Sequence, residues 1–214
     1  MTAADNVNPY LGRYPLLASR RGIWREIARY VRRDAPNAQT VLELGAGYCD
    51  FINTFPASRK LAFDLNAEMA AYADPGVELR IGDAVELAGI EPSSLDLVFA
   101  SNFLEHLDAE QLHRLLVRVR EALRPGGRII LIQPNFRKCP EHYFDDDTHK
   151  TVFSDESLAQ LVVSHGFKIE KIVPGLLPFS MKSRLPKWPI LVRLYLSSPV
   201  KPGAAQMYLV ASRR

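Results

Sequence analysis

An α/β fold with a doubly wound, mostly parallel, seven-stranded sheet is predicted by two features of the sequence. Short apolar runs alternate with stretches of helical periodicity, which is the pattern of a parallel sheet covered by helices on both faces. The first five runs are nearly continuous in apolar character, as expected for strands buried on both sides. The strands are expected at residues 40–44, 60–63, 78–81, 95–100, 128–133, 167–173 and 206–211.

The last of these strands is expected to run antiparallel. Helices are predicted at about 20–33, 48–55, 66–72, 109–123 and 154–165, so several neighbouring strands have a crossover helix between them. Residues 174–205 instead contain six prolines and no convincing crossover helix. A parallel return needs such a crossover, so an antiparallel final strand fits this segment better.

Length and composition favour one soluble domain. A chain of 214 residues suits a single α/β core, which we divide into an N-terminal arm and helix (1–36) and a cofactor-binding domain (37–214). The net charge is only +3 with basic residues spread along the chain, so nucleic acid is an unlikely partner. The beginning of the chain lacks signal-peptide order, and Cys49 and Cys139 form no disulfide framework. We therefore expect a cytoplasmic protein.

The strongest local signal is a glycine loop after the first predicted strand. The segment reads Glu43-Leu44-Gly45-Ala46-Gly47 and leads into an apolar helix start. Glycine lets a backbone turn sharply and approach a ligand with no Cβ in the way. Ligands of open parallel sheets bind outside the carboxyl ends of the strands. Taken alone, the same pattern also fits a strand-to-helix turn that binds nothing.

Polar residues recur at the ends of the following strands. Asp64 ends the second strand, where a carboxylate can accept hydrogen bonds from ribose hydroxyls. Asp83 follows the third strand, where it could accept from an adenine amine. Ser101 and Asn102 end the fourth strand. Each residue alone is more often a turn residue or a helix cap, but their recurrence at successive strand ends indicates a ligand site.

With these residues the sequence resembles the class I S-adenosylmethionine-dependent methyltransferases over about residues 38–135. The resemblance rests on the loop at 43–47, Asp64, Gly82-Asp83, and Asp96-Leu97-Val98 with the segment 103–107. It also includes Leu123-Arg124-Pro125-Gly126-Gly127, which is similar to the family's Leu-Lys-Pro-Gly-Gly turn. This turn has a structural reason as well, because proline stops a helix and glycine permits a reversal.

The resemblance implies a cofactor site for S-adenosyl-L-methionine, spread over the loops after four strands. The implied contacts are Glu43, Gly45, Ala46 and Gly47 for the methionine part, Asp64 with the adjacent Leu65 for the ribose side, Asp83 and Ala84 for the adenine, and Ser101 and Asn102 near the sulfonium and the substrate. One departure is Tyr48-Cys49-Asp50, which is bulkier than the glycine-containing sequel frequent in the family.

A nicotinamide-dependent oxidoreductase is the rival from another cofactor class. Its Gly-x-Gly-x-x-Gly pattern requires a third glycine at the position that Asp50 occupies. A carboxylate there would repel a pyrophosphate, whereas S-adenosylmethionine has no phosphate and carries a sulfonium cation. The sequence therefore favours the methyl donor.

Three histidines are candidates for removing a proton from the methyl acceptor. His106 follows the fourth strand, and His142 and His149 lie in a loop after the fifth, at the edge of the expected cleft. Helix packing for His106 and a solvated acidic turn for the other two are the structural alternatives. The spacing of His142 and His149 matches no closed zinc pattern, so no metal is expected.

We predict methyl transfer to a small molecule or to a glycan or lipid-linked intermediate. A protein or RNA methyltransferase and a non-catalytic cofactor-binding scaffold remain alternatives. Residues 174–196 combine apolar side chains and Trp188 with basic residues, so this segment could contact an anionic membrane surface, roof the active site or form a dimer contact. The wider segment 174–205 is the expected substrate roof. The oligomeric state and the acceptor atom are left open.

Overall fold

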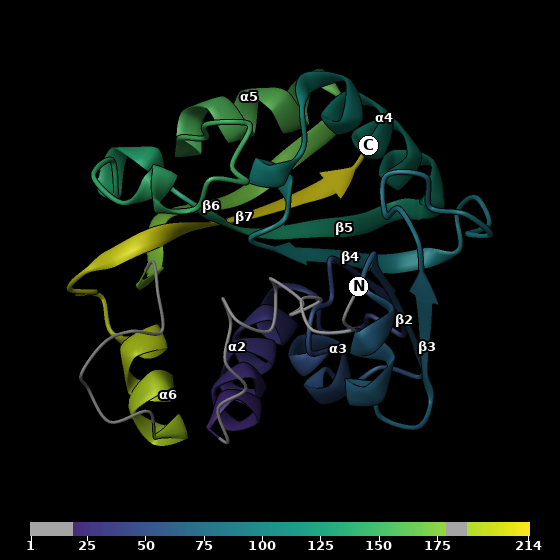
Figure 1. Ribbon diagram of the computed structural model, residues 1–214, viewed down its shortest axis with the longest axis horizontal. Coiled ribbons are helices and arrows are strands. Elements are labelled where there is room, and N and C mark those ends of the chain that lie inside the picture. Colours follow the sequence, from purple (N-terminus) through teal and green to yellow (C-terminus); the bar gives the residue numbers. More distant parts are fainter. Residues whose placement is uncertain (1–18, 179–187) are drawn as a thin grey trace, which may run out of the picture.

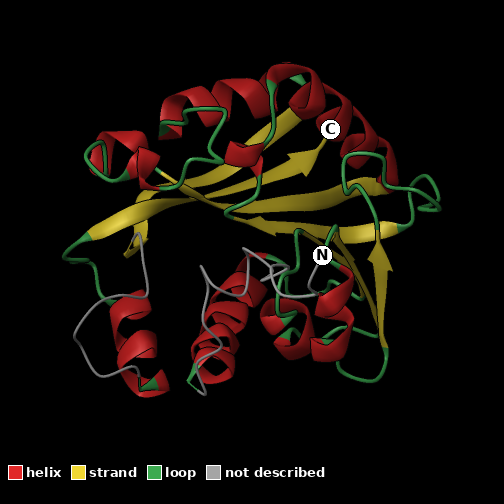
Figure 2. Ribbon diagram, in the orientation of Figure 1, coloured by secondary structure: helices red, strands yellow, loops and turns green. Residues whose placement is uncertain are grey.

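The computed structural model describes residues 19–178 and 188–214. These residues form one seven-stranded sheet with the order β3-β2-β1-β4-β5-β7-β6. Helices α4 and α5 cover one face of the sheet, and α2, α3 and α6 cover the other, so the molecule has three layers (Figures 1 and 2). The strands are β1 (Thr40–Leu44), β2 (Arg59–Asp64), β3 (Val77–Ile81), β4 (Leu95–Ser101), β5 (Leu123–Pro134), β6 (Phe167–Pro178) and β7 (Ala204–Arg213).

The α-helices lie in most of the connections between these strands. They are α2 (Arg20–Asp34), α3 (Asp50–Thr54), α4 (Ala109–Ala122), α5 (Asp155–Ser164) and α6 (Pro189–Ser197). Short 3-10 helices are η1 (Ala67–Tyr72), η2 (Leu104–His106), η3 (Phe136–Lys138) and η4 (Tyr143–Asp145). All seven predicted strands are present, and the predicted antiparallel return is confirmed, because β7 runs antiparallel to both β5 and β6.

Several elements differ from the sequence-based expectation in length or type. Strands β5 and β6 extend beyond the apolar runs that predicted them, into segments that contain proline and glycine. The helix expected at 66–72 is a 3-10 helix with one buried residue, Met69, so little packing supports a longer α-helix there. The predicted arm, residues 1–18, and part of the predicted roof, residues 179–187, lie outside the described residues.

Two apolar clusters, one on each face, hold the layers together. The cluster under α4 and α5 includes Leu115, Leu116 and Val162. The cluster under α2 and α3 is centred on aromatic rings, with Phe51 stacked on Phe99 at 3.6 Å between ring centroids. Helix α2 belongs to this second cluster, so it packs on the same sheet as the rest of the chain.

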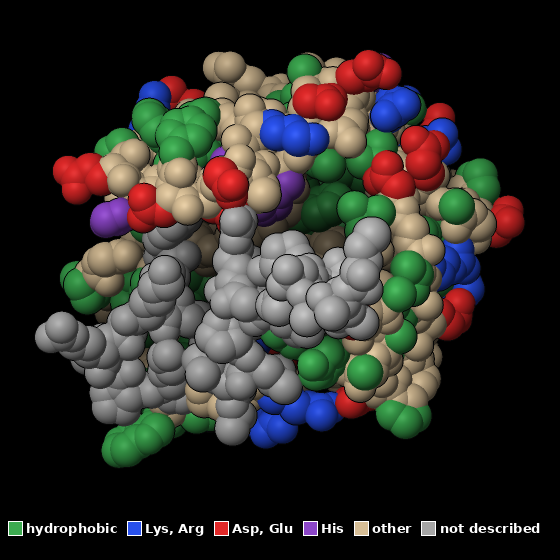
Figure 3. Space-filling model, viewed as in Figure 1, with side chains coloured by type: hydrophobic (Ala, Val, Ile, Leu, Met, Phe, Trp, Pro, Cys, Tyr) green, Lys and Arg blue, Asp and Glu red, His purple; other side chains and the backbone are tan. Residues whose placement is uncertain are grey.

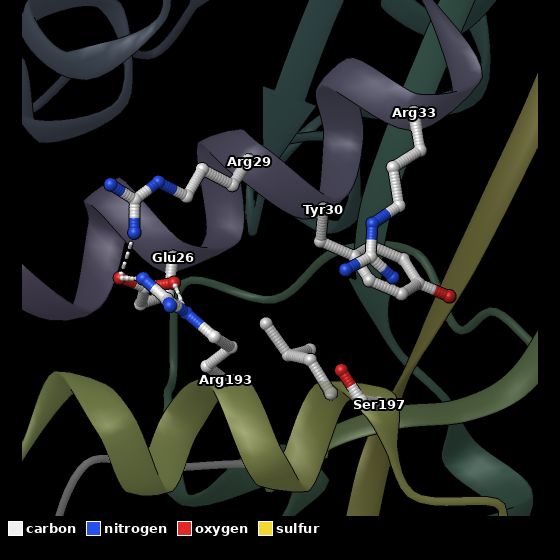
Figure 4. A pocket seen from close by; sticks show the side chains of 7 residues that line it. Glu26, Arg29, Tyr30, Arg33, Arg193 and Ser197 are labelled. Carbon is white, nitrogen blue, oxygen red and sulfur yellow. Dashed lines mark hydrogen bonds and ion pairs between the residues drawn. The ribbon is translucent and has the colours of Figure 1, made fainter.

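Helix α6 is attached to α2 through a buried acid. The Glu26 carboxylate accepts hydrogen bonds from Arg29 of its own helix, α2, and from Arg193 of the facing helix, α6 (Figure 4). A cavity of about 40 Å³ lies beside this contact. It has room for little more than a water molecule, so it is no site for a nucleoside.

Candidate active site

The glycine loop predicted from the sequence joins the end of β1 to α3. Gly45 and Gly47 have φ angles of +64° and +50°, in the left-handed region that favours glycine. The amide of Ala46 donates to the Phe63 carbonyl of β2 at 3.0 Å. A Cβ on Gly45 would lie 2.6 Å from the ring of Phe103, which follows β4. The ends of β1, β2 and β4 therefore meet at this loop, and no side chain fits at position 45.

Asp64 at the end of β2 holds the glycine loop through a hydrogen bond to its backbone. One of its carboxylate oxygens accepts the Gly47 amide at 2.7 Å, and the other accepts the Asn66 amide at 2.8 Å. Each oxygen has a second lone pair, so the carboxylate can accept further hydrogen bonds from a ligand. The acidic residue predicted from the sequence is therefore in direct contact with the glycine loop.

Glu43 has a different environment from the one expected for a ligand contact. It is buried, and one oxygen accepts the backbone amide of Ile52 in the first turn of α3 at 3.0 Å. Burial raises the pKa of this carboxyl group well above its usual value, and the bond from Ile52 opposes the rise. In a dinucleotide-binding protein the amides at this helix start face a pyrophosphate. Here a carboxyl group of the protein already binds one of them.

Asp50 is a second carboxyl group at the start of α3, where a pyrophosphate would otherwise bind. It is the first residue of α3, it is buried, and it forms an ion pair with Arg20 at 2.8 Å. Tyr48 packs edge-on against Tyr72 of η1 at 4.8 Å, so the bulky departure from the family pattern is accommodated between elements of the chain. The start of α3 thus suits a cofactor without phosphate groups.

The other predicted cofactor positions lie at neighbouring strand ends. Leu65 is 75% exposed next to Asp64, and Asp83 is exposed with one oxygen accepting the Val85 amide in a turn, while Ala84 is buried. Ser101 ends β4, where it pairs with Ile132 of β5. Asn102 has a φ of +48°, and its side-chain oxygen accepts a hydrogen bond from Gln206 of β7 at 2.7 Å.

Past Asn102, the loops after β4 and β5 bring three ionisable side chains together. One ligand atom from each of Glu105, His106 and His149 lies within 4.8 Å of the other two. The loop after β5 reaches this place because the amides of Lys150 and Thr151 both donate to the Glu105 carbonyl. Figure 3 shows histidine and acidic side chains close together on this side of the molecule.

Glu105 is the residue of this cluster that the sequence analysis missed as a site residue. Its side chain is 0% exposed, and that of His149 is 4% exposed. Neither carboxylate oxygen of Glu105 has a hydrogen-bond partner among the residues that the structure describes. Burial, together with the nearby Asp146 carboxylate, raises the pKa of Glu105 to about 8. The Glu-His pair within the 103–107 motif was the available signal, but a sequence does not display burial.

The structure does not bring His142 into the cluster. Its side chain is 65% exposed, and its Nδ1 lies 3.1 Å from Asp145 on the same 3-10 turn. Of the three histidines predicted as candidate bases, His106 and His149 are together, with 5.0 Å between ring centroids, and His142 belongs to the solvated acidic turn.

Comparisons with known proteins agree with this geometry. A family model described as a methyltransferase domain matches residues 42–131, from β1 into β5. Phosphoethanolamine N-methyltransferase 1 of Triticum aestivum is 29% identical over 136 residues, which cover 55% of this chain and 27% of that protein. An uncharacterized 37.1 kDa protein in transposon TN4556 of Streptomyces fradiae is 27% identical over 166 residues, 66% of this chain and 47% of that one. The chain thus spans about half or less of these curated relatives.

The fold has the same architecture as solved methyltransferases. A SAM-dependent methyltransferase from Archaeoglobus fulgidus has a TM-score of 0.69 at 19% identity, covering 98% of this chain and 100% of that one. The strand order and the helices on both faces of the sheet define a Rossmann-like α/β protein. Residues 42–131 match a methyltransferase domain, and the fold is that of solved S-adenosylmethionine-dependent methyltransferases, whose methyl donor is S-adenosylmethionine.

Gly45→Ala is expected to destabilise the protein more than Gly76→Ala, its matched control. Both glycines have positive φ angles, +64° and +91°, so both substitutions carry a backbone strain of about 1–2 kcal/mol. Only the new Cβ at position 45 meets the Phe103 ring, whereas at position 76 nothing among the described residues lies within 4 Å. We expect an extra loss of about 1–3 kcal/mol in urea unfolding. Equal losses would contradict the close packing of this loop.

Proposed function

We propose that the chain transfers a methyl group from S-adenosylmethionine, bound at the glycine loop, to a small molecule or to a glycan or lipid-linked intermediate. The acceptor binds over the carboxyl ends of β4 and β5. The observation that carries this proposal is the contact between Asp64 and the glycine loop, next to the Glu105, His106 and His149 cluster. Donor and acceptor groups then share one edge of the sheet.

The cofactor lies across the ends of β1, β2 and β3 in this proposal. The Asp64 carboxylate accepts the ribose hydroxyls, in addition to its bonds from Gly47 and Asn66. The adenine covers the exposed Leu65 side chain, which removes apolar surface from water, and Asp83 and Ala84 lie at its edge. Gly45 and Gly47 leave room for the methionine part.

The acceptor's nucleophilic atom forms a bond to the methyl carbon while the bond from carbon to the sulfonium sulfur breaks. S-adenosylhomocysteine leaves, and a proton is lost from the acceptor where its chemistry requires it. Asn102 and Ser101 border the reacting atoms, and the histidine cluster lies directly after them in the chain. His149 and His106 are the side chains through which the protein promotes that proton loss.

A small or lipid-linked acceptor is favoured over protein or RNA. The chain has a net charge of +3, which provides little attraction for a polyanion. One relative, the wheat phosphoethanolamine N-methyltransferase, is named for a small acceptor. The buried position of His149 also suits an acceptor that can enter a narrow site.

Helix α6 offers a surface through which a lipid-linked acceptor could be approached. Trp188, Ile190 and Leu194 are 64%, 51% and 59% exposed, on a helix that is attached to α2 through its Arg193. Aromatic and aliphatic side chains beside basic residues bind the interface of anionic membranes. In the described part of the chain, no helix has the length and apolar character needed to cross a bilayer.

Asp64→Ala is expected to weaken binding of S-adenosylhomocysteine by about 10-fold to 100-fold, because a hydrogen bond to a charged group contributes about 1.5–3 kcal/mol. Isothermal titration calorimetry measures the dissociation constant of S-adenosylhomocysteine for each variant. Asp74→Ala is the control, because this acid lies after η1 and pairs with Arg21 of α2. If the folded wild-type chain binds neither S-adenosylmethionine nor S-adenosylhomocysteine, the proposed function is wrong.

His149→Ala is expected to retain S-adenosylhomocysteine affinity and to lower methyl transfer at least 100-fold, in the range of lost acid–base catalysis. Transfer is followed with tritium-labelled methyl groups added to a cell extract, which is then separated into small-molecule, lipid, protein and RNA fractions. Label in the first two fractions supports the proposed acceptor class. Label confined to protein or RNA contradicts it. His142→Ala, outside the cluster, is the matched control and should transfer normally.

Vesicle co-sedimentation tests the membrane contact. The wild-type chain is expected to sediment with anionic vesicles more than with neutral ones, and a Trp188→Ser, Leu194→Ser double variant should lose most of this binding. Both side chains are more than half exposed, so the double variant should remain folded. Wild-type protein that stays in the supernatant with both kinds of vesicle would refute the membrane contact and leave methyl transfer untouched.

A further inference from the structure

The Glu105, His106 and His149 cluster has a polar centre that the described side chains leave unsatisfied. Both oxygens of Glu105 and the Nδ1 of His149 are buried without a hydrogen-bond partner within residues 19–178 and 188–214. Nε2 of His149 lies 3.9 Å from Oε1 of Glu105. This distance is too long for a hydrogen bond. Buried polar groups in folded proteins normally have a hydrogen-bond partner or a bound ion, so we expect a further atom to bind at the centre of this cluster.

We infer that Glu105, His106 and His149 bind a divalent transition-metal ion of the Zn²⁺ type, with open coordination positions toward the methyl acceptor. This inference deepens the proposed function and rests on it. One carboxylate oxygen and two imidazole nitrogens form a ligand set that suits zinc and other first-row metals. Mg²⁺ and Ca²⁺ prefer oxygen ligands throughout. Three protein ligands are also typical of catalytic sites, where the remaining positions take water or substrate.

The hydrogen bonds around His106 prepare it as a ligand. The Thr148 hydroxyl lies 2.5 Å from an Asp146 oxygen, so its only proton is donated to that carboxylate. The same hydroxyl lies 2.9 Å from Nδ1 of His106, and it therefore accepts a proton from this nitrogen. The Thr148 carbonyl, at 3.4 Å, can also only accept from it. In the neutral ring Nδ1 then carries the proton and Nε2 the lone pair.

This relay is the arrangement usual around metal-bound histidine. The ring nitrogen that does not bind the metal commonly donates to a hydroxyl, carbonyl or carboxylate, which fixes the orientation of the ring. Here Asp146 acts through Thr148 on His106. Thr148 and Asp146 are positioning residues in this scheme. Asp146 and its chain neighbours Asp145 and Asp147 add negative charge to the loop that carries Thr148, which attracts a cation.

The geometry needs only a small adjustment to hold an ion. Metal–ligand bonds of about 2.0–2.2 Å in a tetrahedron place ligand atoms roughly 3.3 Å apart. The three ligand atoms now lie within 4.8 Å of one another, so they would close by up to about 1.5 Å around the ion. No metal was expected from the sequence, because the spacing of His142 and His149 matches no closed zinc pattern, whereas the fold brings His149 to residues more than forty positions earlier.

The ion would activate a hydroxyl group of the methyl acceptor. An acceptor hydroxyl coordinated at an open position loses its proton more easily, because the cation stabilises the resulting oxygen anion. The proton goes to bulk water, the oxygen bonds to the methyl carbon, and the carbon–sulfur bond of the sulfonium breaks. No redox change is involved. His149 is then a ligand, and the cation takes over the role that a base would have.

The test uses the full chain carrying His113→Ala. His113 and His165 form a second histidine pair on the surface, with 3.0 Å between Nδ1 and Nε2, and removing one of them leaves the Glu105, His106 and His149 cluster as the single candidate site within residues 19–178 and 188–214. Chelator-treated protein is titrated with Zn²⁺ by calorimetry, and Co²⁺ is followed by its visible absorption. We expect one equivalent of Zn²⁺, and at least tenfold weaker binding in Glu105→Gln and in His149→Ala. His142→Ala should bind as the parent does.

Thr148→Val is the second kind of variant, because it removes the hydroxyl relay and leaves all three ligands in place. It should weaken Zn²⁺ binding by about tenfold, the lower end for an outer-shell partner. S-adenosylhomocysteine binding is measured on every sample and should not depend on the metal. Protein that binds S-adenosylhomocysteine but no stoichiometric Zn²⁺ or Co²⁺ overturns the metal site and leaves the methyltransferase. Zn²⁺ binding that survives Glu105→Gln and His149→Ala overturns it as well. Loss of S-adenosylhomocysteine binding in the parent refutes the proposed function itself.

Discussion

The hydrogen bond from the Gly47 amide to the Asp64 carboxylate is the contact on which the candidate site depends. It joins the loop after β1 to the end of β2, and so fixes the positive φ angles that the loop adopts. With the loop in this position, Gly45 lies against the Phe103 ring, and the chain after β4 is directed past the sheet toward the histidine cluster. One carboxylate therefore organises both the proposed donor side and the loop that leads to the histidine cluster.

Much of the fold could be predicted from the sequence because strands buried on two faces leave a clear mark. All of the runs that predicted strands are strands. Strands β1 and β4 are mostly apolar and buried, whereas β3 and β6 alternate apolar with charged side chains. The start of β5 and the end of β6 were not predicted, because proline and glycine are uncommon within strands. Residues of both segments nevertheless pair with β4 and β7. The sequence also could not show that η1 is a 3-10 helix, because 3-10 helices and short α-helices have similar amino-acid compositions.

The two halves of the site differed in how far the sequence could predict them. The glycine loop and Asp64 are close in the chain, and their contact follows from adjacent parallel strands. The contact of Glu105 with His149 depends instead on a long loop that returns to pair its backbone with the Glu105 carbonyl. No periodicity encodes such a return. The burial that gives Glu105 its unusual environment is likewise a property of the assembled layers, not of the Glu-His pair in the sequence.

The position of β7 between β5 and β6 has a consequence for the order in which the protein matures on the ribosome. Strand β6 is synthesised before its sheet neighbour β7, so the edges of β5 and β6 stay unpaired until residues 204–213 emerge. Unpaired apolar edges are prone to association with other chains. The nascent chain can form the part of the sheet built from β1, β2 and β3 early. Asn102 receives its partner Gln206 only when β7 arrives, so the proposed acceptor side is completed after the proposed donor side.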